Sequence, residues 1–182
     1  NEKTKVIVPV HFAGYPCEIW GVREIALKHD VYVIEDACHA FGAEYRYRGR
    51  WYKIGSCKHS DMTVFSFHPV KSITTGEGGA ITTNNKLLYE KLRCLRNHGI
   101  YKDRNTTKKG QWFYEMRALG FNYRITDFQC ALGLSQLRKI DFFIERRRRI
   151  AEIYSEELRD ISGLIELPSV GKDKKHAWHL FV

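Results

Sequence analysis

A single lysine stands between the end of an apolar run and a glycine-rich turn in FSFHPVKSITTGEGGAITTN, residues 65–84. The apolar run ends at Ser66, Lys71 follows five residues later, and glycines occupy positions 76, 78 and 79. Strand patterning resumes at Ala80. This arrangement predicts a strand that ends at the mouth of a sheet, where backbone N–H groups are free and ligands collect. Lys71 is therefore a candidate for chemistry.

Polar side chains follow two other apolar runs in the same way. Each run is typical of a buried strand, and the residues at its carboxyl end are polar or charged. In a parallel sheet, the carboxyl ends of neighbouring strands face one crevice. We therefore expect three strand ends to converge there, carrying His11, then Glu35, Asp36 and His39, then Ser66 and His68.

A carboxylate, a hydroxyl and a lysine at one sheet edge suit a cofactor with a basic ring nitrogen, a phosphate and an aldehyde. Pyridoxal 5'-phosphate (PLP) has all three groups, and proteins hold it with a Schiff-base lysine and an acidic partner for the pyridinium nitrogen. Each residue alone is weak evidence, because an Asp after a strand is commonly a helix cap and a lone lysine is commonly solvated. The combination indicates a PLP site.

The elements that must position these residues follow a strand, helix, strand order. Such an order within about 30 residues is a βαβ unit and implies a parallel pair of strands. The expected elements are strands over 5–14 and 31–40 with a helix over 17–30 between them, a hairpin over 44–56, strands over 61–67 and 79–85, and a helix over 86–99.

The second half of the chain is expected to be helical after a long connection. Residues 100–120 are polar and are typical of a long loop, a kind of segment that is often functional. From Thr126 to about Asp160 the pattern is helical, with a break near Asp141, and HAWHLFV at 176–182 predicts a further strand. The whole pattern favours an α/β fold with a mostly parallel sheet flanked by helices.

Composition narrows the class of protein. The chain has 182 residues, of which 43% are apolar, so it can build the core of a folded domain. Five cysteines are widely spread, odd in number and without a CxxC pair, which fits reduced cytoplasmic thiols better than disulfides or a zinc site. No run is typical of a transmembrane helix or a signal peptide. We expect no metal, no membrane contact and a cytoplasmic protein.

The net charge of +9 is consistent with a nucleic-acid partner or with an acidic small substrate. The densest basic run, ERRRRI at 145–150, points in nearly every direction on a helix, because each residue is rotated by about 100° from the last. No recognised nucleic-acid signature accompanies it. We therefore expect an anionic substrate and no nucleic acid.

Three long segments, VIEDACHA, SFHPVKSITTGEGGAITTN and LGFNYRITDFQCALGLSQL, resemble the DegT/DnrJ/EryC1/StrS family in content and order. Its members are PLP-dependent nucleotide-sugar aminotransferases with the type I, aspartate aminotransferase-like fold. The forms EDACHA, FHPVK and RNHGI look most like the branch of pseudaminic acid biosynthesis, which aminates C4 of a UDP-linked 4-keto-6-deoxy-N-acetyl sugar. The resemblance implies a substrate such as UDP-2-acetamido-2,6-dideoxy-hexos-4-ulose, with glutamate as the amino donor.

Carried over by position, the resemblance implies roles for five residues. Lys71 forms the Schiff base and moves the proton between the substrate and the cofactor. Asp36 pairs with the pyridinium nitrogen, and His39 lies near the phenolic oxygen. Ser66 donates its hydroxyl to the cofactor phosphate. Asn122 reaches the phosphate in the neighbouring subunit, which implies a homodimer with shared sites.

The resemblance also bears on domain organisation. Members of the family are about twice as long, so the chain is expected to be the central piece of an enzyme, truncated at both ends. We expect residues 1–124 to belong to the large PLP-binding domain. Residues 125–182 are expected to form linking helices and the start of the small C-terminal subdomain.

Two other functions stay open. One is a PLP-dependent sugar dehydratase of the same family, although those enzymes replace the Schiff-base lysine with histidine and Lys71 is present here. The other is a basic binding fragment without catalysis. Outside the five site residues we expect structural roles for Glu35 and for most of the remaining candidates, which are His11, His68, His98, His176 and His179.

Overall fold

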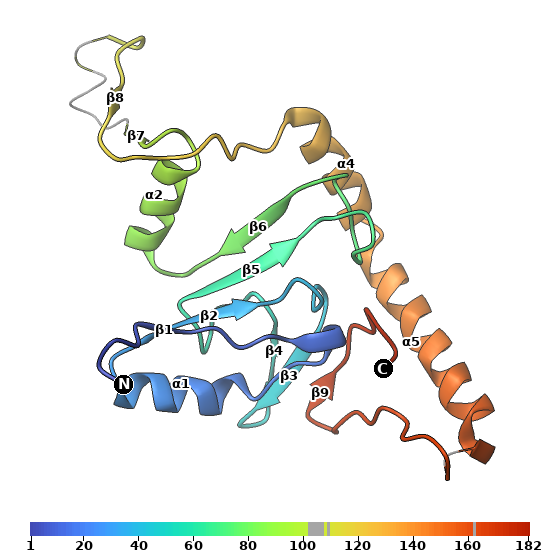
Figure 1. Ribbon diagram of the computed structural model, residues 1–182. Coiled ribbons are helices and arrows are strands. Elements are labelled where there is room, and N and C mark those ends of the chain that lie inside the picture. The colour runs from blue at the N-terminus through green and yellow to red at the C-terminus, as the bar shows by residue number, and fades with distance from the viewer. Residues whose placement is uncertain (102–107, 109, 162) are drawn as a thin grey trace. The chain divides into compact units, whose positions relative to one another are not determined.

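The computed structural model describes residues 1–101, 108, 110–161 and 163–182 (Figure 1). Contacts divide the chain into two compact units, one made of residues 1–83 and 127–182 and the other of residues 84–126. The first unit contains all the predicted site residues except Asn122. The expected boundary between a large domain and a small subdomain, at residues 124 and 125, stays a prediction.

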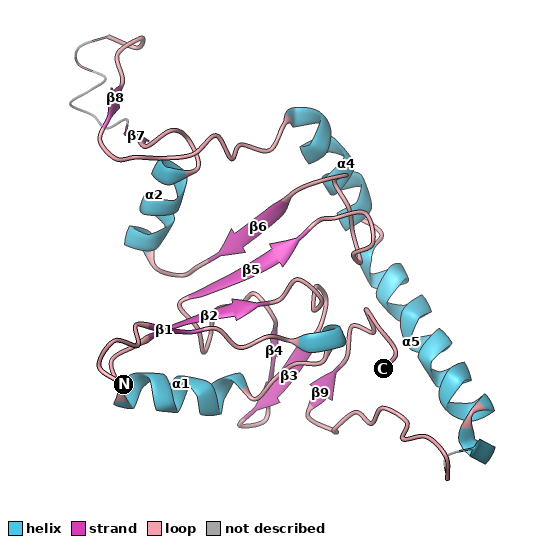
Figure 2. Cartoon of the chain, viewed as in Figure 1, coloured by secondary structure: helices cyan, strands magenta, loops and turns pink. Residues whose placement is uncertain are grey.

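A four-stranded sheet forms the centre of the first unit (Figure 2). Its strands, in spatial order, are β1 (Val6–Ile7), β2 (Tyr32–Asp36), β5 (Met62–Ser66) and β6 (Gly79–Thr82). The first three run parallel, as the βαβ pattern predicts, and β6 is antiparallel to β5 because the short connection between them reverses the chain. Asp36 lies opposite Val64, so the carboxyl ends of β2 and β5 are neighbours.

β1 is shorter than the strand expected over 5–14. Pro9 has no N–H to give to a ladder, and pairing beyond it survives only as an isolated bridge between Val10 and Asp36. The Pro9 carbonyl still accepts the N–H of Asp36 at 2.9 Å, and the N–H of His11 donates to the Asp36 carbonyl at 3.0 Å. The chain then turns through a short 3-10 helix, η1 (Phe12–Gly14).

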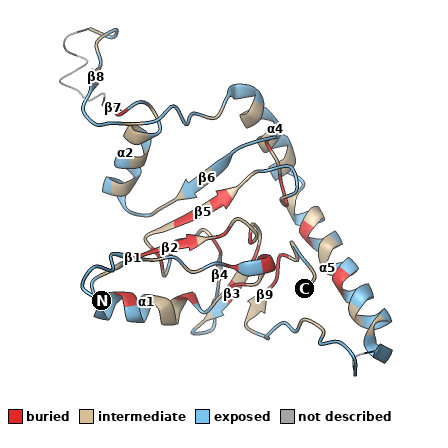
Figure 3. Ribbon diagram, viewed as in Figure 1, coloured by how far each residue is buried: buried red, intermediate tan, exposed pale blue. Residues whose placement is uncertain are grey.

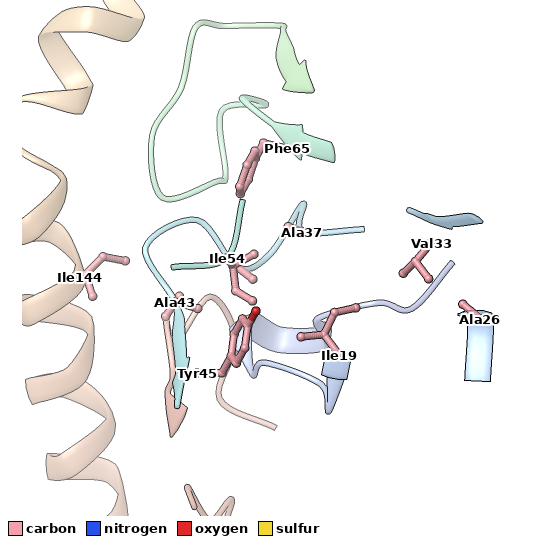
Figure 4. Packing of buried hydrophobic residues seen from close by; sticks show 11 residues of the cluster. Ile19, Ala26, Val33, Ala37, Ala43, Tyr45, Ile54, Phe65 and Ile144 are labelled. Carbon is pink, nitrogen blue, oxygen red and sulfur yellow. The ribbon is translucent and has the colours of Figure 1, made fainter. Parts of the chain in front are cut away.

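The hydrophobic core lies where helix α1 (Ile19–Lys28), β2, β5 and a hairpin meet. Ala26 of α1 faces Val33 of β2, while Tyr45, Ile54 and Phe65 fill the centre (Figure 4). The buried segments of β2 and β5 stand out in Figure 3. Both strands alternate buried and partly exposed residues, which fixes which side chains enter the core.

The hairpin expected around Gly49 is present as β3 (Glu44–Tyr47) and β4 (Arg50–Lys53). A third strand, β9 (Lys174–Lys175), pairs with β3. The strand expected over 176–182 is wrong. The backbone N–H groups of Ala177 and His179 donate to the carbonyls of Gly14 and Ala13, at 3.0 and 2.9 Å, and so leave the β pattern.

Two helices complete the first unit, α4 (Asp127–Leu137) and α5 (Ile140–Glu157), with a short 3-10 turn, η2 (Arg159–Ile161), after them. The break between α4 and α5 lies at residues 138–139, just before the expected position near Asp141. Ile144 and Ala151 are the buried residues of α5, and Ile144 packs into the core (Figure 4). Among the described residues, no helix combines the length and apolarity needed to cross a membrane.

The second unit contains helix α2 (Lys86–Leu95) and two short paired strands, β7 (Ile100–Tyr101) and β8 (Glu115–Met116). The Asn85 side chain caps α2 by accepting the N–H groups of Leu87 and Leu88 at 2.9 and 3.2 Å. The helix ends before the expected Gly99. The loop expected over 100–120 begins with β7 and contains β8 near its end, and residues 102–107 and 109 lie outside the described part of the chain.

Candidate active site

Asp36 ends β2 with its carboxylate fixed by the next turn of chain. Its Oδ1 accepts the N–H of Cys38 at 3.0 Å, a short side-chain to main-chain turn typical of Asp. Partial burial would raise the pKa of Asp36, but the hydrogen bonds to Cys38 and the nearby Lys71 charge outweigh it and lower the pKa. The carboxylate is therefore charged at neutral pH.

Lys71 lies in a loop that leaves β5 and returns as β6. The N–H of Phe67 donates to the Gly78 carbonyl at 2.8 Å, and the Phe67 carbonyl accepts the N–H of Thr75 at 3.0 Å. Ile73 and Thr75 are buried beneath the loop, while Lys71 is partly exposed. The loop thus holds the lysine beside the carboxyl ends of β2 and β5.

The glycine turn closes this loop by bringing two strands into backbone contact. Ser66 lies opposite Gly79, and a Cβ placed on Gly79 would lie 2.6 Å from the Phe65 carbonyl oxygen. Real Cβ atoms do not approach a carbonyl oxygen so closely. The glycine is therefore required where β6 begins.

Gly79→Ala is expected to lower the free energy of unfolding by about 1–3 kcal/mol, the usual cost of forcing an extra carbon into a packed site. Gly21→Ala is the control, because a Cβ there meets nothing within 4 Å in helix α1. That change should raise stability by about 0.5–1 kcal/mol, since alanine favours a helix over glycine. Urea unfolding measures both variants, and equal effects at the two positions would contradict the close contact.

His39 follows Asp36 by three residues, and its ring is contacted on two sides. The Phe12 ring centroid lies 5.9 Å from it and the His179 centroid 4.4 Å. Nδ1 of His39 is buried and has no hydrogen-bond partner within the described structure. Burial and the nearby Lys71 charge lower the pKa of His39, although Asp36 opposes them. The ring is therefore neutral at neutral pH.

The structure brings four of the five predicted site residues to one edge of the sheet. Asp36 and Ser66 end adjacent parallel strands, and the Lys71 charge influences both Asp36 and His39. The Ser66 hydroxyl oxygen accepts the N–H of His68 at 3.3 Å. Asn122 belongs to the second unit, where it forms an isolated β bridge with Asn97. Its role at the site stays a proposal.

His11 and Glu35 do not face the crevice, contrary to the expectation for the polar residues of strand ends. Side chains alternate along β2, so Glu35 points into the core when Asp36 points away from it. The exposed fractions of His11 and Glu35 are 0% and 2%, and His11 Nε2 lies 2.8 Å from Glu35 Oε2. Their expected structural role is thus supported by geometry.

The Glu35 carboxylate is satisfied by three donors. His11 Nδ1 accepts the N–H of Cys17 at 3.0 Å, so the proton lies on Nε2, which donates to Glu35. The hydroxyls of Ser60 and Thr63 donate to the other carboxylate oxygen. Burial would raise the pKa of Glu35, but these hydrogen bonds outweigh it and lower the pKa.

The lowered pKa makes stability depend on pH with a definite sign. Because Glu35 binds its proton less readily when folded, its contribution is complete above the ordinary carboxyl pKa of 4.5. The contribution is lost as pH falls through the lowered folded value. Glu35→Gln should lower the free energy of unfolding at pH 7 by about 1–3 kcal/mol.

The variant should also lose part of the acid dependence between pH 5 and 2. Glu24→Gln, on the exposed face of α1, should leave the wild-type profile unchanged. Urea unfolding across this pH range makes the comparison. A Glu35→Gln profile parallel to that of the wild type would show that the carboxylate contributes nothing to the acid transition.

A cavity lies elsewhere, between the hairpin and the helices α4 and α5. It has a volume of about 500 Å³ and contains none of the predicted site residues. Its walls combine the apolar side chains of Phe41, Ile54 and Ile144 with charged groups, including a Lys175–Glu44 pair at 2.8 Å. Within the described residues, no group of three His, Cys, Asp or Glu side chains could hold a metal ion.

The site residues fit PLP chemically. A charged carboxylate, a hydroxyl and a lysine share one sheet edge, as the cofactor's ring nitrogen, phosphate and aldehyde require. The buried Nδ1 of His39 has hydrogen-bonding capacity that the described structure does not use. Buried polar atoms are almost always paired, so a bound molecule would complete the site.

Comparisons with known proteins agree with this chemistry. A profile described as the DegT/DnrJ/EryC1/StrS aminotransferase family matches residues 1–182. An uncharacterized protein of Methanocaldococcus jannaschii is 47% identical over 183 residues, covering 100% of this chain and 46% of that protein. A UDP-4-amino-4,6-dideoxy-N-acetyl-beta-L-altrosamine transaminase of Campylobacter jejuni is 39% identical over 175 residues, covering 95% and 43%. The chain thus spans about half the length of these relatives.

A solved structure gives the same result for the fold. Helicobacter pylori PseC, described as an aminotransferase involved in the biosynthesis of pseudoaminic acid, superposes with a TM-score of 0.82 at 34% identity. The match covers 100% of this chain and 45% of that one. The expected fold class, the central part of an aminotransferase-like α/β fold with a mostly parallel sheet, is confirmed.

Proposed function

Because this chain belongs to the DegT/DnrJ/EryC1/StrS aminotransferase family, we propose that the protein carrying it is a PLP-dependent nucleotide-sugar aminotransferase. It would transfer an amino group to a keto carbon of a nucleotide-linked deoxy sugar. The observation that carries the proposal is the gathering of Asp36, His39 and Lys71 where β2 and β5 end. A lysine beside a charged carboxylate is what this chemistry needs.

The residues divide the work. When bound, PLP supplies an aldehyde that takes up amino groups and a ring that withdraws electrons. Asp36, held charged by its surroundings, would keep a proton on the ring nitrogen, and the Ser66 hydroxyl would bind the phosphate. The Lys71 amine would hold the cofactor and would take and return the proton at the reacting carbon of the substrate.

The substrate proposed is a UDP-linked 4-keto-6-deoxy-N-acetyl sugar, aminated at C4 with glutamate as the donor. Support comes from the likeness to the Campylobacter jejuni transaminase. The net charge of +9 also suits a diphosphate, which one or two well-placed cations can bind. A sugar dehydratase is the second candidate, and the presence of Lys71 argues against it.

The test incubates the full-length protein with PLP, glutamate and a panel of UDP-, GDP- and dTDP-linked 4-keto sugars. NMR of the products should show an amino group at C4 of the UDP-linked sugar and 2-oxoglutarate in equal amount. Loss of a sugar hydroxyl without a new amino group would establish the dehydratase instead. Visible PLP absorbance with no reaction on any sugar would contradict the substrate class. Absence of PLP binding would favour the third alternative, a basic binding protein without catalysis.

We also propose that two subunits share each site, with Asn122 reaching the phosphate of the neighbouring subunit. An amide donates a hydrogen bond to a phosphate without adding charge. Full-length Lys71→Ala and Asn122→Asp variants, each nearly inactive alone, should complement when mixed. Half the dimers would be mixed, each with one intact site of two, so about a quarter of wild-type activity should return.

Native mass spectrometry of the mixture must show that the subunits exchange. If exchange occurs and activity stays at the level of the separate variants, Asn122 acts within its own subunit and the shared site is refuted. A mixture of Lys71→Ala with Asp36→Asn is the control. Lys71 and Asp36 both lie in the first unit, so a subunit supplies both residues to the same site and each site of a mixed dimer keeps one substitution. That mixture should regain no activity above the sum of its parts.

A further inference from the structure

The segment after β9 is held by hydrogen bonds to η1 and from α5. The N–H groups of His179 and Leu180 both donate to the Ala13 carbonyl, at 2.9 and 3.1 Å. From α5, Nη1 of Arg147 lies within hydrogen-bond distance of the carbonyls of Trp178 and His179, at 3.3 and 3.5 Å. The backbone position of His179 is therefore set by two elements distant from it in sequence.

Gly14 lets this segment approach the end of the β2 turn. Its φ is +98°, and a Cβ placed on it would lie 3.0 Å from the His39 carbonyl oxygen and 3.1 Å from the Trp178 nitrogen. Only a glycine leaves both backbones this close. The backbones of Gly14, His39 and Trp178 thus come into contact with one another. This contact brings the ring of His179 against the ring of His39.

The two imidazole rings share an unusual feature. Their centroids are 4.4 Å apart with the planes inclined at 38°. Nδ1 of each ring is buried, and neither has a hydrogen-bond partner within the described structure. These two atoms are the only buried side-chain nitrogen or oxygen atoms without a partner in the described part of the chain. Their occurrence in one pair of touching rings indicates a single missing partner.

The electrostatic setting keeps His179 neutral. Burial lowers the pKa of His179 to about 4, helped by the nearby charges of Lys71 and Arg147. A neutral imidazole uses each nitrogen as either a donor or an acceptor. The Lys71 charge also contributes to lowering the pKa of both rings, so the lysine lies near both.

We propose that His179 is a second imidazole of the cofactor site, and that its Nδ1 and that of His39 both hydrogen-bond to the molecule bound beside Lys71. This inference rests on the proposed function, under which that molecule is PLP. A buried water on the two nitrogens is the competing explanation, because water commonly satisfies such atoms. Binding of PLP would change the environment of Nδ1 only in the first case.

Two substitutions of His179 in the full-length protein distinguish the effect of losing the polar Nδ1 atom from the effect of losing the ring. His179→Asn keeps a polar side-chain atom about where Nδ1 stands but removes the ring. His179→Phe keeps a ring to pack on His39 but removes the nitrogen. We expect His179→Phe to weaken PLP binding by about tenfold or more and His179→Asn by less than about threefold. Titration of the visible absorbance measures both, with thermal unfolding to confirm that each variant folds.

Binding by His179→Phe that equals the wild type would overturn the proposal, as would tighter binding by His179→Phe than by His179→Asn. A measurement on the wild type does not depend on how the variants fold. In protein labelled with ¹⁵N-histidine, the Nδ1 resonances of His179 and His39 should both shift when PLP is added. The two variants assign the His179 signal.

Inorganic phosphate alone is the control ligand and should leave both Nδ1 resonances in place. If PLP binds, as its absorbance shows, while the His179 Nδ1 resonance does not move, the proposal is refuted and the proposed function stands. If the wild type binds no PLP at all, the proposed function fails and this inference fails with it.

Discussion

Lys71→Ala is expected to abolish turnover, lowering kcat/KM by about 10⁴-fold or more. Lys71 is the only lysine between the end of β5 and the glycine turn, in a loop closed by the Phe67 and Gly78 hydrogen bond. Within this described loop there is therefore no second amine to hold the cofactor covalently or to move the proton at the reacting carbon. Steady-state assays of the full-length variant, saturated with PLP, measure the effect.

Two lysines on nearby segments are the controls. Lys53 ends β4 and Lys58 follows it, and both are exposed. Lys53→Ala and Lys58→Ala should keep activity within about threefold of the wild type, as surface changes usually do. Borohydride reduction of the PLP-loaded wild type, followed by peptide mapping, should place the label on Lys71. A label on Lys58 or Lys53 would assign the chemistry to another residue.

The sequence could predict the sheet edge because the chemistry there depends on local order. The apolar runs before Asp36 and Ser66 have the length of buried strands, and the helix between the first two runs implies parallel pairing. The pairing of β2 with β5, which makes the carboxyl ends at Asp36 and Ser66 neighbours, is seen only in the structure. The order of strands and polar residues thus predicts Asp36, Ser66 and Lys71 at the carboxyl ends of strands, and the structure has Asp36 and Ser66 at the ends of the adjacent strands β2 and β5.

Side-chain direction at the strand ends was harder to predict. Glu35 and Asp36 are adjacent acids, and which one faces the core depends on the register of β2 against its neighbours. In the structure, Glu35 points to a buried imidazole and two hydroxyls, and these donors come from two segments distant in sequence, at His11 and at residues 60–63. Such a set of partners has no local signature in the sequence.

The position of His179 could not be predicted for the same reason. The pattern HAWHLFV favours a strand, but Ala177 and His179 bond to the η1 turn instead of to a strand partner. That turn is more than 160 residues away along the chain. The contact depends on Gly14, whose missing Cβ admits two backbones at once. Tertiary contact here overrides strand propensity.

Asp36→Asn is expected to lower kcat/KM by about 100-fold or more while the fold is retained. The asparagine keeps an oxygen that can accept the Cys38 N–H, now at 3.0 Å, so the turn after β2 can persist. What it removes is the negative charge, which the lowered pKa of Asp36 otherwise maintains throughout the neutral range. Without that charge, a ring nitrogen bound there loses its proton and the ring withdraws electrons less strongly.

Two measurements distinguish this electronic role from a loss of binding. PLP should still bind to Asp36→Asn, seen by its absorbance, but the absorbance should change with pH in a way that the wild type's does not, because the ring nitrogen would titrate near neutral pH. Asp30→Asn is the matched control, since Asp30 is exposed and its φ of 51° suits asparagine. That variant should match the wild type in rate and spectrum. Near-normal turnover of Asp36→Asn would rule out the role of Asp36, whatever its effect on the spectrum.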